Sequence, residues 1–276
     1  MKDSINHLLA ALTLFTRLPW WRIKEIPAEA FKHAVDFWPW AGLLTGGSMA
    51  LTFYIGIQFL PLPLTLLLCI GVRLLLTGAL HEDGLADFFD GMGGGTTRER
   101  TLEIMKDSHI GTYGVLGLVL YFLFLYNTCN ELTLSYLRES LTLEAAGRNP
   151  ILMMATTMWF ADVWAKSVAS FIIVLPYARN EEEAKVKVVY QRPGFTEWFT
   201  HLLRIVLALA LPFTLMIHAG ISPNPMALLT SVLVFLALIL YLKRRINGYT
   251  GDCCGATFLC CEMAYLMAQL LAYTAD

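Results

Sequence analysis

The sequence predicts an all-α, polytopic integral membrane protein, on the evidence of its composition and its long apolar segments. Hydrophobic residues make up 57% of the 276 residues and charged residues only 15%, whereas soluble domains average roughly 45–50% and about 25%. The mean hydropathy is +0.57. Most of the surface must therefore face lipid. The net charge of −2 provides no basic field for polyanions, so no nucleic-acid partner is expected.

About seven segments are long and apolar enough to cross a hydrocarbon layer about 30 Å thick, which takes about 20 helical residues. We expect the short run 62–80 to continue as a helix beyond the apolar zone. Before the spans, apolar residues at helical spacing from Ile5 to Phe15 predict an N-terminal interfacial helix. No repeat or linker divides the chain, which predicts one membrane-embedded catalytic domain, 1–276. The expected spans are 37–60, 62–80, 112–130, 150–175, 201–221, 226–242 and 255–273.

The basic residues gather on one side of these predicted crossings. Fifteen lysines and arginines fall on the side of the N-terminus, and only Arg138 and Arg148 fall on the other. The positive-inside rule then predicts a cytoplasmic N-terminus and an external C-terminus. The fifteen are Lys2, Arg17, Arg22, Lys24, Lys32, Arg98, Arg100, Lys106, Arg179, Lys185, Lys187, Arg192, Lys243, Arg244 and Arg245.

The richest polar segment, 81–111, directly follows the second predicted span. Asp83, Asp87 and Asp90 lie at i, i+4 and i+7, within about 60° of one helical face. Three like charges repel one another, and a helix C-terminus disfavours anions, so we expect a cation to offset them. Carboxylate oxygens suit Mg²⁺, or Mn²⁺, binding a phosphorylated substrate. The alternative is a solvated acidic helix end. Glu82 points about 100° away and is the weaker candidate ligand.

A glycine cluster follows the aspartates. Gly91, Gly93, Gly94 and Gly95 are expected to break the helix and to allow close backbone approach. Such a loop can offer N–H groups to phosphate oxygens, which makes Gly93 and Gly94 candidate substrate-binding residues. A plain flexible turn is an equally good interpretation of the same glycines.

After the glycine cluster, the sequence has several basic residues, followed by Asp107 and His109. Lys106 and the arginines before it suit a pyrophosphate beside a metal. Ordinary charges facing lipid headgroups are the alternative. Asp107 and His109 are candidates for taking a proton from an attacking hydroxyl.

A second polar segment, 244–255, lies on the same predicted side of the membrane. Asp252 stands between Gly251 and the last apolar run. That position suits a helix N-cap and a functional role equally well. A shared site requires that both polar segments reach one face, as they are predicted to do.

Three charged residues lie at membrane depth, where charge is expensive and is usually buried with partners. Asp162 and Lys166 are four residues apart, so we expect a structural ion pair. A transporter would instead use these residues and Arg73 as a translocation path. The sequence, however, lacks internal repeats and matching broken helices, and its polar residues gather at one face.

Five sequence blocks resemble the cobalamin synthase family, in order along nearly the whole chain. The aspartate block followed by KDSHIGTYG is highly specific, whereas FTRLP alone would be weak. One local departure is Lys166, because members of the family tend to carry arginine in the fourth span. The blocks are FTRLP, FWPWAG, HEDGLADFFDGMGGG, EIMKDSHIGTYGV and NGYTGDCCGA.

The resemblance implies a Mg²⁺-dependent reaction in the last stage of cobalamin biosynthesis. In this family a ribose hydroxyl of α-ribazole, or of its 5′-phosphate, attacks adenosylcobinamide-GDP at the phosphorus bonded to the corrinoid's aminopropanol arm. GMP leaves, and adenosylcobalamin or its 5′-phosphate forms. The resemblance also implies a bacterial inner-membrane enzyme with its active site at the cytoplasmic face and the lipid bilayer as its surroundings.

The family blocks also imply roles for individual residues. They identify Asp83, Asp87 and Asp90 with the metal and pyrophosphate site. Asp107, His109 and Asp252 are the catalytic candidates, without an assignment of the base. The substrate-binding candidates are Arg17, His81, Gly93, Gly94, Lys106 and Gly251.

A second family shares one fragment of the sequence. Asp87 through Gly91 is similar to the DxxDG motif of CDP-alcohol phosphotransferases, which also act at a membrane face. Their fuller motif continues with an alanine–arginine pair, where this sequence has Gly94 and Gly95. The similarity is therefore a distant analogy, and such an enzyme is the alternative function.

Overall fold

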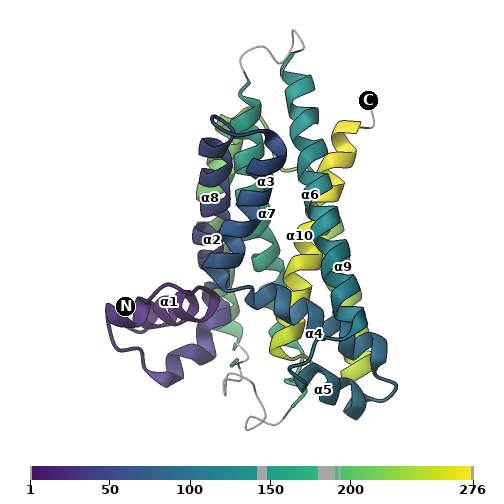
Figure 1. Cartoon of the computed structure of the whole chain (residues 1–276). Helices are drawn as coiled ribbons and strands as arrows, with labels where there is room; N and C mark the ends of the chain where they lie inside the picture. Colours follow the sequence, from purple (N-terminus) through teal and green to yellow (C-terminus); the bar gives the residue numbers. More distant parts are fainter. Residues whose placement is uncertain (1, 142–147, 180–189, 192–193, 275–276) are drawn as a thin grey trace.

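A computed structural model describes residues 2–141, 148–179, 190–191 and 194–274, and this part of the chain is almost entirely helical (Figure 1). Among these residues the only β-type pairing is an isolated parallel bridge between Tyr177 and Tyr249. The predicted all-α fold is thus confirmed. The helices are α1 (Lys2–Phe15), η1 (Trp20–Arg22), η2 (Ala28–Phe37), α2 (Trp38–Gly56), α3 (Leu62–Thr77), α4 (Leu80–Gly94), α5 (Arg98–Lys106), α6 (Thr112–Ser140), α7 (Pro150–Ala169), η4 (Ser170–Val174), α8 (Phe195–His218), α9 (Pro225–Ile246) and α10 (Gly251–Thr274).

Within the described residues, five helical segments rather than seven are long and apolar enough to cross a membrane by themselves. They are α6, α7 with η4, α8, α9 and α10; α3 and α4 add a sixth only if the bent pair counts as one span. The other expected span, α2, is 19 residues long. Glycines on α2 let α7 approach closely. A Cβ on Gly46 would lie 2.9 Å from the Cβ of Asp162, and one on Gly47 would lie 3.1 Å from the Trp159 ring.

A sharp bend between α3 and α4 overturns the prediction of a helix that continues beyond 62–80. Gly78 and Ala79 both have left-handed backbone, with φ of 67° and 55°. The two helices therefore meet at 90°. The backbone N–H of Arg17 donates to the Leu76 carbonyl (2.7 Å), and the Arg17 guanidinium occupies the space that a side chain at Gly78 would need. Asp83 consequently lies in the first turn of a helix, not near a C-terminus.

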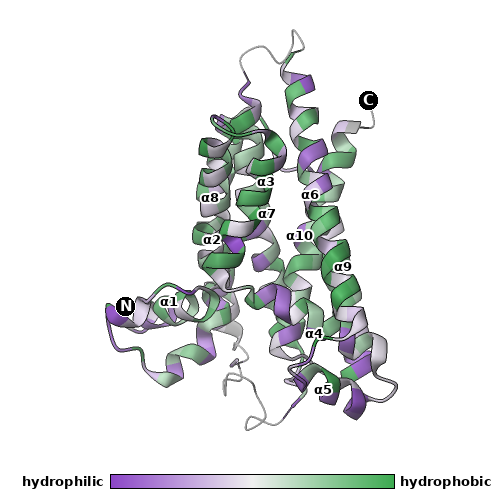
Figure 2. Cartoon of the chain, viewed as in Figure 1, coloured by the Kyte–Doolittle hydropathy of each residue, from purple (hydrophilic) through white to green (hydrophobic). Residues whose placement is uncertain are grey.

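The polar elements gather at one end of the bundle. Figure 1 shows α1 lying transverse to the long helices at the lower end, with α4, α5 and the start of α10 at that same end. The C-terminal end of α10 lies at the upper end. Figure 2 shows hydrophilic residues concentrated over α4, α5 and the lower end of α9. Three of the fifteen cations of the predicted basic side, Lys185, Lys187 and Arg192, lie outside the described residues.

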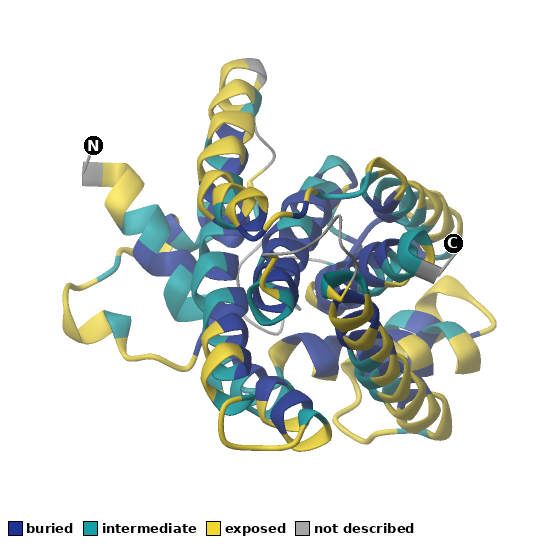
Figure 3. Ribbon diagram, turned by 90° about the horizontal axis from the view of Figure 1, so that it is seen from above, coloured by how far each residue is buried: buried dark blue, intermediate teal, exposed yellow. Residues whose placement is uncertain are grey.

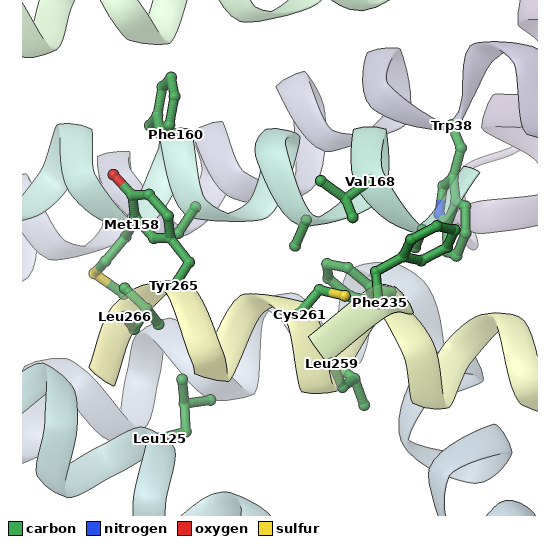
Figure 4. Close-up of a cluster of buried hydrophobic side chains, with 14 of the residues drawn as sticks. Trp38, Leu125, Met158, Phe160, Val168, Phe235, Leu259, Cys261, Tyr265 and Leu266 are labelled. Atoms are coloured by element: carbon green, nitrogen blue, oxygen red, sulfur yellow. The ribbon is translucent and has the colours of Figure 1, made fainter. Parts of the chain in front are cut away.

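Part of the core lies between α7 and α10 and holds α10 in position. Seventy-eight per cent of the most apolar part of α7 is buried, against 22% for α9. Figure 3 shows the buried faces turned toward the middle of the bundle. In Figure 4 the side chain of Met158 meets that of Leu266, and the Tyr265 ring reaches from α10 to α7. The rings of Phe160 and Tyr265 are 5.7 Å apart. A close-packed core of this kind leaves α10 little freedom to shift.

Candidate active site

A small cavity of about 100 Å³ opens at the lower end of the bundle, where α4 and α10 begin. Phe15, Trp38 and Leu80 contribute apolar walls. Of the predicted site residues, the cavity brings together His81, Asp83, Gly251 and Asp252. The polar lining consists of His81, Asp83, Tyr177, Arg179, Tyr190 and Asp252.

Two glycines create this meeting of α4 and α10. A Cβ on Gly84 would lie 3.0 Å from both Cα and the carbonyl oxygen of Asp252, and a Cβ on Gly255 would lie 2.8 Å from the carbonyl oxygen of His81. Contacts this short are rare for real side chains, so only glycine lets the two backbones approach so closely. The close approach places Asp83, the neighbour of Gly84, in the same cavity as Asp252.

Asp252 is held by its own helix start and is not the N-cap. Helix α10 begins at Gly251, and the preceding Thr250 accepts the backbone N–H of Cys253 at its hydroxyl (3.4 Å). The Thr250 hydroxyl also lies 3.2 Å from Asp252 Oδ2, to which it donates. Asp252 is 7% exposed. With the N-cap supplied by Thr250, the Asp252 carboxylate is left to line the cavity.

Asp83 has the opposite environment, because its side chain is exposed. In the part of the chain that the structure describes, its carboxylate makes no hydrogen bond or ion pair. Its place in the first turn of α4 favours the anion, since a helix N-terminus carries partial positive charge. Arg179 lines the same cavity and acts electrostatically on both Tyr177 and Cys253. Within the described residues, Asp83 thus has a free carboxylate in a cavity that is also lined by the Arg179 cation.

Asp90 is engaged elsewhere, which separates it from Asp83. Its two carboxylate oxygens accept the backbone N–H groups of Gly111 (2.7 Å) and Gly114 (2.8 Å), so the side chain fastens α4 to the N-terminus of α6. Asp87 is half-buried and is not part of the cavity lining. Among the described residues, no three His, Cys, Asp or Glu side chains are grouped closely enough to hold a metal ion. The predicted row of three aspartates therefore does not assemble as a metal site by itself.

The glycine cluster packs helices together instead of forming an open loop. Helix α4 continues through Gly93 and Gly94, and only Gly95 leaves the helix. A Cβ on Gly93 would lie 2.6 Å from the Tyr113 ring. The N–H groups of these glycines belong to the last turn of α4, where they point back along the helix. The cluster thus ends the helix as expected, but only at Gly95, and Gly91, Gly93 and Gly94 lie within α4.

Asp107 and His109 pair with each other outside the cavity. His109 Nδ1 lies 2.6 Å from Asp107 Oδ1, and both side chains are exposed. Hydrogen bonds from the His109 ring and backbone hold the pKa of Asp107 below its ordinary value. Lys106, the last residue of α5, lines a separate groove with Arg98 and Arg179. These two candidate bases thus lie apart from the Asp83–Asp252 cavity.

Of the remaining candidates, His81 and Gly251 line the cavity, whereas Arg17 is not among its lining residues. His81 is buried, with its ring 4.9 Å from that of Phe258 and 5.6 Å from that of Trp38. Its Nε2 has no hydrogen-bond partner among the described residues. The Arg17 guanidinium lies against Gly78 at the α3–α4 bend, and Gly78 is two residues before α4 begins at Leu80. Gly251 has open space where a Cβ would be.

The charges at membrane depth form buried networks, separate from the cavity lining. Arg73 is wholly buried and lies 2.7 Å from Glu262 and 3.5 Å from Glu82. The expected Asp162–Lys166 ion pair is confirmed, with Nζ 2.5 Å from Oδ1. Lys166 Nζ also lies 4.0 Å from the centre of the Phe258 ring, a distance typical of a cation–π contact.

Three cavity residues were missed by the sequence reasoning. Arg179 counted only as one of many basic residues, although it directly follows an apolar span on the basic side. Tyr177 and Tyr190 gave no signal beyond an interfacial location. Burial raises the pKa of both tyrosines, so their hydroxyls stay protonated as hydrogen-bond donors.

Comparison with known proteins confirms the family that the sequence blocks resemble. The family profile described as "Cobalamin-5-phosphate synthase" matches residues 7–270. A relative from Shewanella sp. (strain W3-18-1), named "Adenosylcobinamide-GDP ribazoletransferase", is 33% identical over 268 residues, which cover 97% of this chain and 95% of the relative. One of the same name from Shewanella baltica (strain OS185) is 34% identical over 270 residues, covering 98% and 93%. No solved structure matches significantly. The chain belongs to the cobalamin-5-phosphate synthase family.

Proposed function

We propose that this chain is an adenosylcobinamide-GDP ribazoletransferase that joins adenosylcobinamide-GDP and α-ribazole, or its 5′-phosphate, and releases GMP. The observation that carries the proposal is the meeting of two family blocks in one cavity: Asp83 comes from HEDGLAD and Asp252 from NGYTGDCCGA. These aspartates are nearly 170 residues apart in the sequence, and the close approach of α4 and α10 brings them into one cavity. A shared reaction centre is the chemical reason for such a meeting.

The cavity suits the reacting phosphate rather than a whole substrate. Its volume of about 100 Å³ is below the roughly 300–1,000 Å³ of sites that enclose drug-sized ligands. The corrinoid ring therefore stays outside, at the membrane face, while its phosphorylated arm enters. Arg179 is then within the cavity to bind phosphate oxygens and to neutralise charge on the leaving GMP. Tyr177 and Tyr190 supply further donors.

The donor set fits the Mg²⁺ that we propose as cofactor, with Mn²⁺ as a substitute. Asp83 has a free carboxylate and Asp252 lies in the same cavity. Protein Mg²⁺ sites commonly use one or two carboxylates, with waters and substrate phosphates as the other ligands. Asp83 and Asp252 would hold the ion, with Asp87 one helical turn from Asp83. When bound, Mg²⁺ would supply charge stabilisation at the phosphate oxygens.

We also propose that the cavity opens on the cytoplasmic side of a bacterial inner membrane. The support is that α5 and the C-terminal end of α9 lie at the end of the bundle that carries the cavity (Figure 1), and these segments contain Arg98, Arg100, Lys106, Lys243, Arg244 and Arg245. Reporter fusions test this orientation. A fusion partner that is active only outside the cytoplasm should be active at the C-terminus and inactive at the N-terminus, and the reverse pattern would refute the orientation.

The test of the function is GMP release by the purified full chain in detergent. We expect GMP only when adenosylcobinamide-GDP, α-ribazole and Mg²⁺ are all present, and no CMP from a CDP-linked lipid donor with a lipid extract. Asp87→Asn, in protein that remains folded, should reduce GMP release. GMP formation without α-ribazole, or CMP formation from the lipid donor, would refute the proposal.

A further inference from the structure

A second recess lies beside the cavity, and Arg179 belongs to both. This groove, of about 420 Å³, runs along α5. Its volume falls within the roughly 300–1,000 Å³ range of small-molecule sites. Five of its seven lining residues are charged. They are Arg98, Glu99, Leu102, Glu103, Lys106, Ala178 and Arg179.

Hydrogen bonds to backbone carbonyls fix two cations of the groove. Arg98 donates from Nε to the carbonyl of Ile246 (2.9 Å) and from Nη2 to that of Ala178 (2.8 Å). Arg179 donates from Nη2 to the carbonyl of Leu102 (2.9 Å). Within the described residues, Nε and Nη1 of Arg179 make no hydrogen bond. These N–H groups are held in place but unused, which lowers the entropic cost of binding an anion.

The charge balance of the groove is positive. Three cations, Arg98, Lys106 and Arg179, face two carboxylates. One of these carboxylates, Glu103, is paired from outside the groove by Arg100 at 2.6 Å. Glu99 is 79% exposed and lies 3.9 Å from Arg98 Nη1, so solvent screens it strongly. The groove therefore attracts anions.

We propose that this groove binds the phosphate of the nucleoside monophosphate released by the reaction, with Arg179 passing it from the cavity and Lys106 contacting it at the outer end. The inference rests on the proposed function and adds a product site to it. A lipid headgroup offers the same phosphate chemistry. The groove, however, has only Leu102 and Ala178 as apolar lining, which gives acyl chains no continuous apolar path.

The test is equilibrium binding of radiolabelled GMP to the full chain in phosphatidylcholine nanodiscs. Lys106→Ala should weaken GMP binding about threefold to tenfold, since one charged contact is lost. Binding of guanosine, which has no phosphate, should not change. The matched control is Lys243→Ala, which removes an exposed lysine from the last turn of α9, outside the groove lining, and it should bind GMP as the unaltered chain does.

Two results would overturn the product site: no measurable GMP binding by the unaltered chain, or equal GMP affinity in Lys106→Ala and Lys243→Ala. Adding phosphatidylglycerol to the nanodiscs separates the two phosphate sources. Retained GMP binding supports the nucleotide, whereas its displacement assigns the groove to lipid headgroups. If the unaltered chain turns over normally but Lys106→Ala does not change GMP binding, the product site is refuted and the proposed function stands. If GMP binding depends on Lys106 but the unaltered chain releases no GMP from adenosylcobinamide-GDP, the proposed function is refuted and the phosphate site of the groove stands.

Discussion

Glu82 and Asp83 are neighbours in sequence, yet they belong to two polar regions with opposite properties. Glu82 is buried and joins Arg73 and Glu262 in the bundle core. Asp83 is exposed, has no partner among the described residues and lines the cavity with Asp252. Successive residues on a helix point about 100° apart. Glu82 therefore faces the bundle core, whereas the next residue, Asp83, faces the cavity. Charges in the first region stabilise the bundle, and those in the second are available for chemistry.

The largest expected effect concerns the buried region. Arg73→Ala leaves Glu262 and Glu82 without their cation, which should cost about 3–5 kcal/mol of stability. Thermal unfolding in detergent, followed by circular dichroism, measures the loss. The comparison variant is Arg100→Ala, which breaks an exposed pair with Glu103 and should cost at most about 1 kcal/mol. Equal stability of the two variants would show that the buried network does not hold the bundle together.

In the cavity region, activity should fall while stability is kept. Asp83→Asn removes the free carboxylate and should reduce GMP release about 10²–10³-fold, the usual loss for one preorganised electrostatic group. Stability should fall by at most about 1 kcal/mol, the loss of a favourable charge at a helix N-terminus, because the side chain is exposed and unpaired within the described residues. Glu131→Gln, at an exposed position on α6, is the matched control and should leave turnover intact. A stability loss without an activity loss would reverse the roles of the two regions.

The close approach of α4 and α10 can be tested separately from the charges. Gly84→Ala forces a Cβ to within about 3.0 Å of Asp252 backbone atoms and should cost about 1–3 kcal/mol by overpacking. It should also reduce turnover, because Asp83 and Asp252 move apart. Gly71→Ala is the control, since its Cβ would meet nothing within 4 Å, and it should be neutral or stabilise by up to about 1 kcal/mol. Similar melting temperatures for the two variants would contradict this packing.

Asp90 tests whether an aspartate of the predicted row is structural. Asp90→Ala removes the acceptor for the N–H groups of Gly111 and Gly114 and should cost about 1–2 kcal/mol, like the loss of a helix cap. Asp90→Asn keeps one oxygen as an acceptor and should lose less stability and retain most of the Mg²⁺ affinity. A loss of Mg²⁺ binding in Asp90→Asn with unchanged stability would instead support the metal role.

The smallest expected effect is a pH dependence. His109 lowers the pKa of Asp107, so this pair stabilises the folded state above the ordinary pKa of aspartate, near about 4. The contribution is lost as the pH falls through the lowered pKa. The stability difference between the unaltered chain and His109→Ala should therefore be small at neutral pH and vanish in strong acid. Unfolding midpoints across the pH range would reveal it, and a difference that grows toward acid pH would contradict the assignment.

The sequence predicted the helical membrane fold and the end of the bundle where the polar residues gather, because both follow from apolar length and charge asymmetry. The 90° bend was not predictable, because Ala79 adopts a left-handed conformation that only its surroundings enforce. The bend turned a presumed helix C-terminus into an N-terminus and brought Asp83 toward Asp252. Helical periodicity also grouped Asp90 with Asp83, but the N–H groups of α6, distant in sequence, engage Asp90. The place of Arg179 in the cavity was not predictable, because a single arginine in a loop produces no periodic pattern in the sequence.

The central claim is that Asp83 and Asp252 act together in one reaction centre, and a double-mutant cycle on GMP release tests it most directly. If the two carboxylates serve the same phosphate, Asp83→Asn and Asp252→Asn combined should lose about as much activity as the more damaging single variant. Losses that multiply, in variants that remain folded, would mean that the two aspartates work independently and that the crossing of α4 and α10 is not the active site.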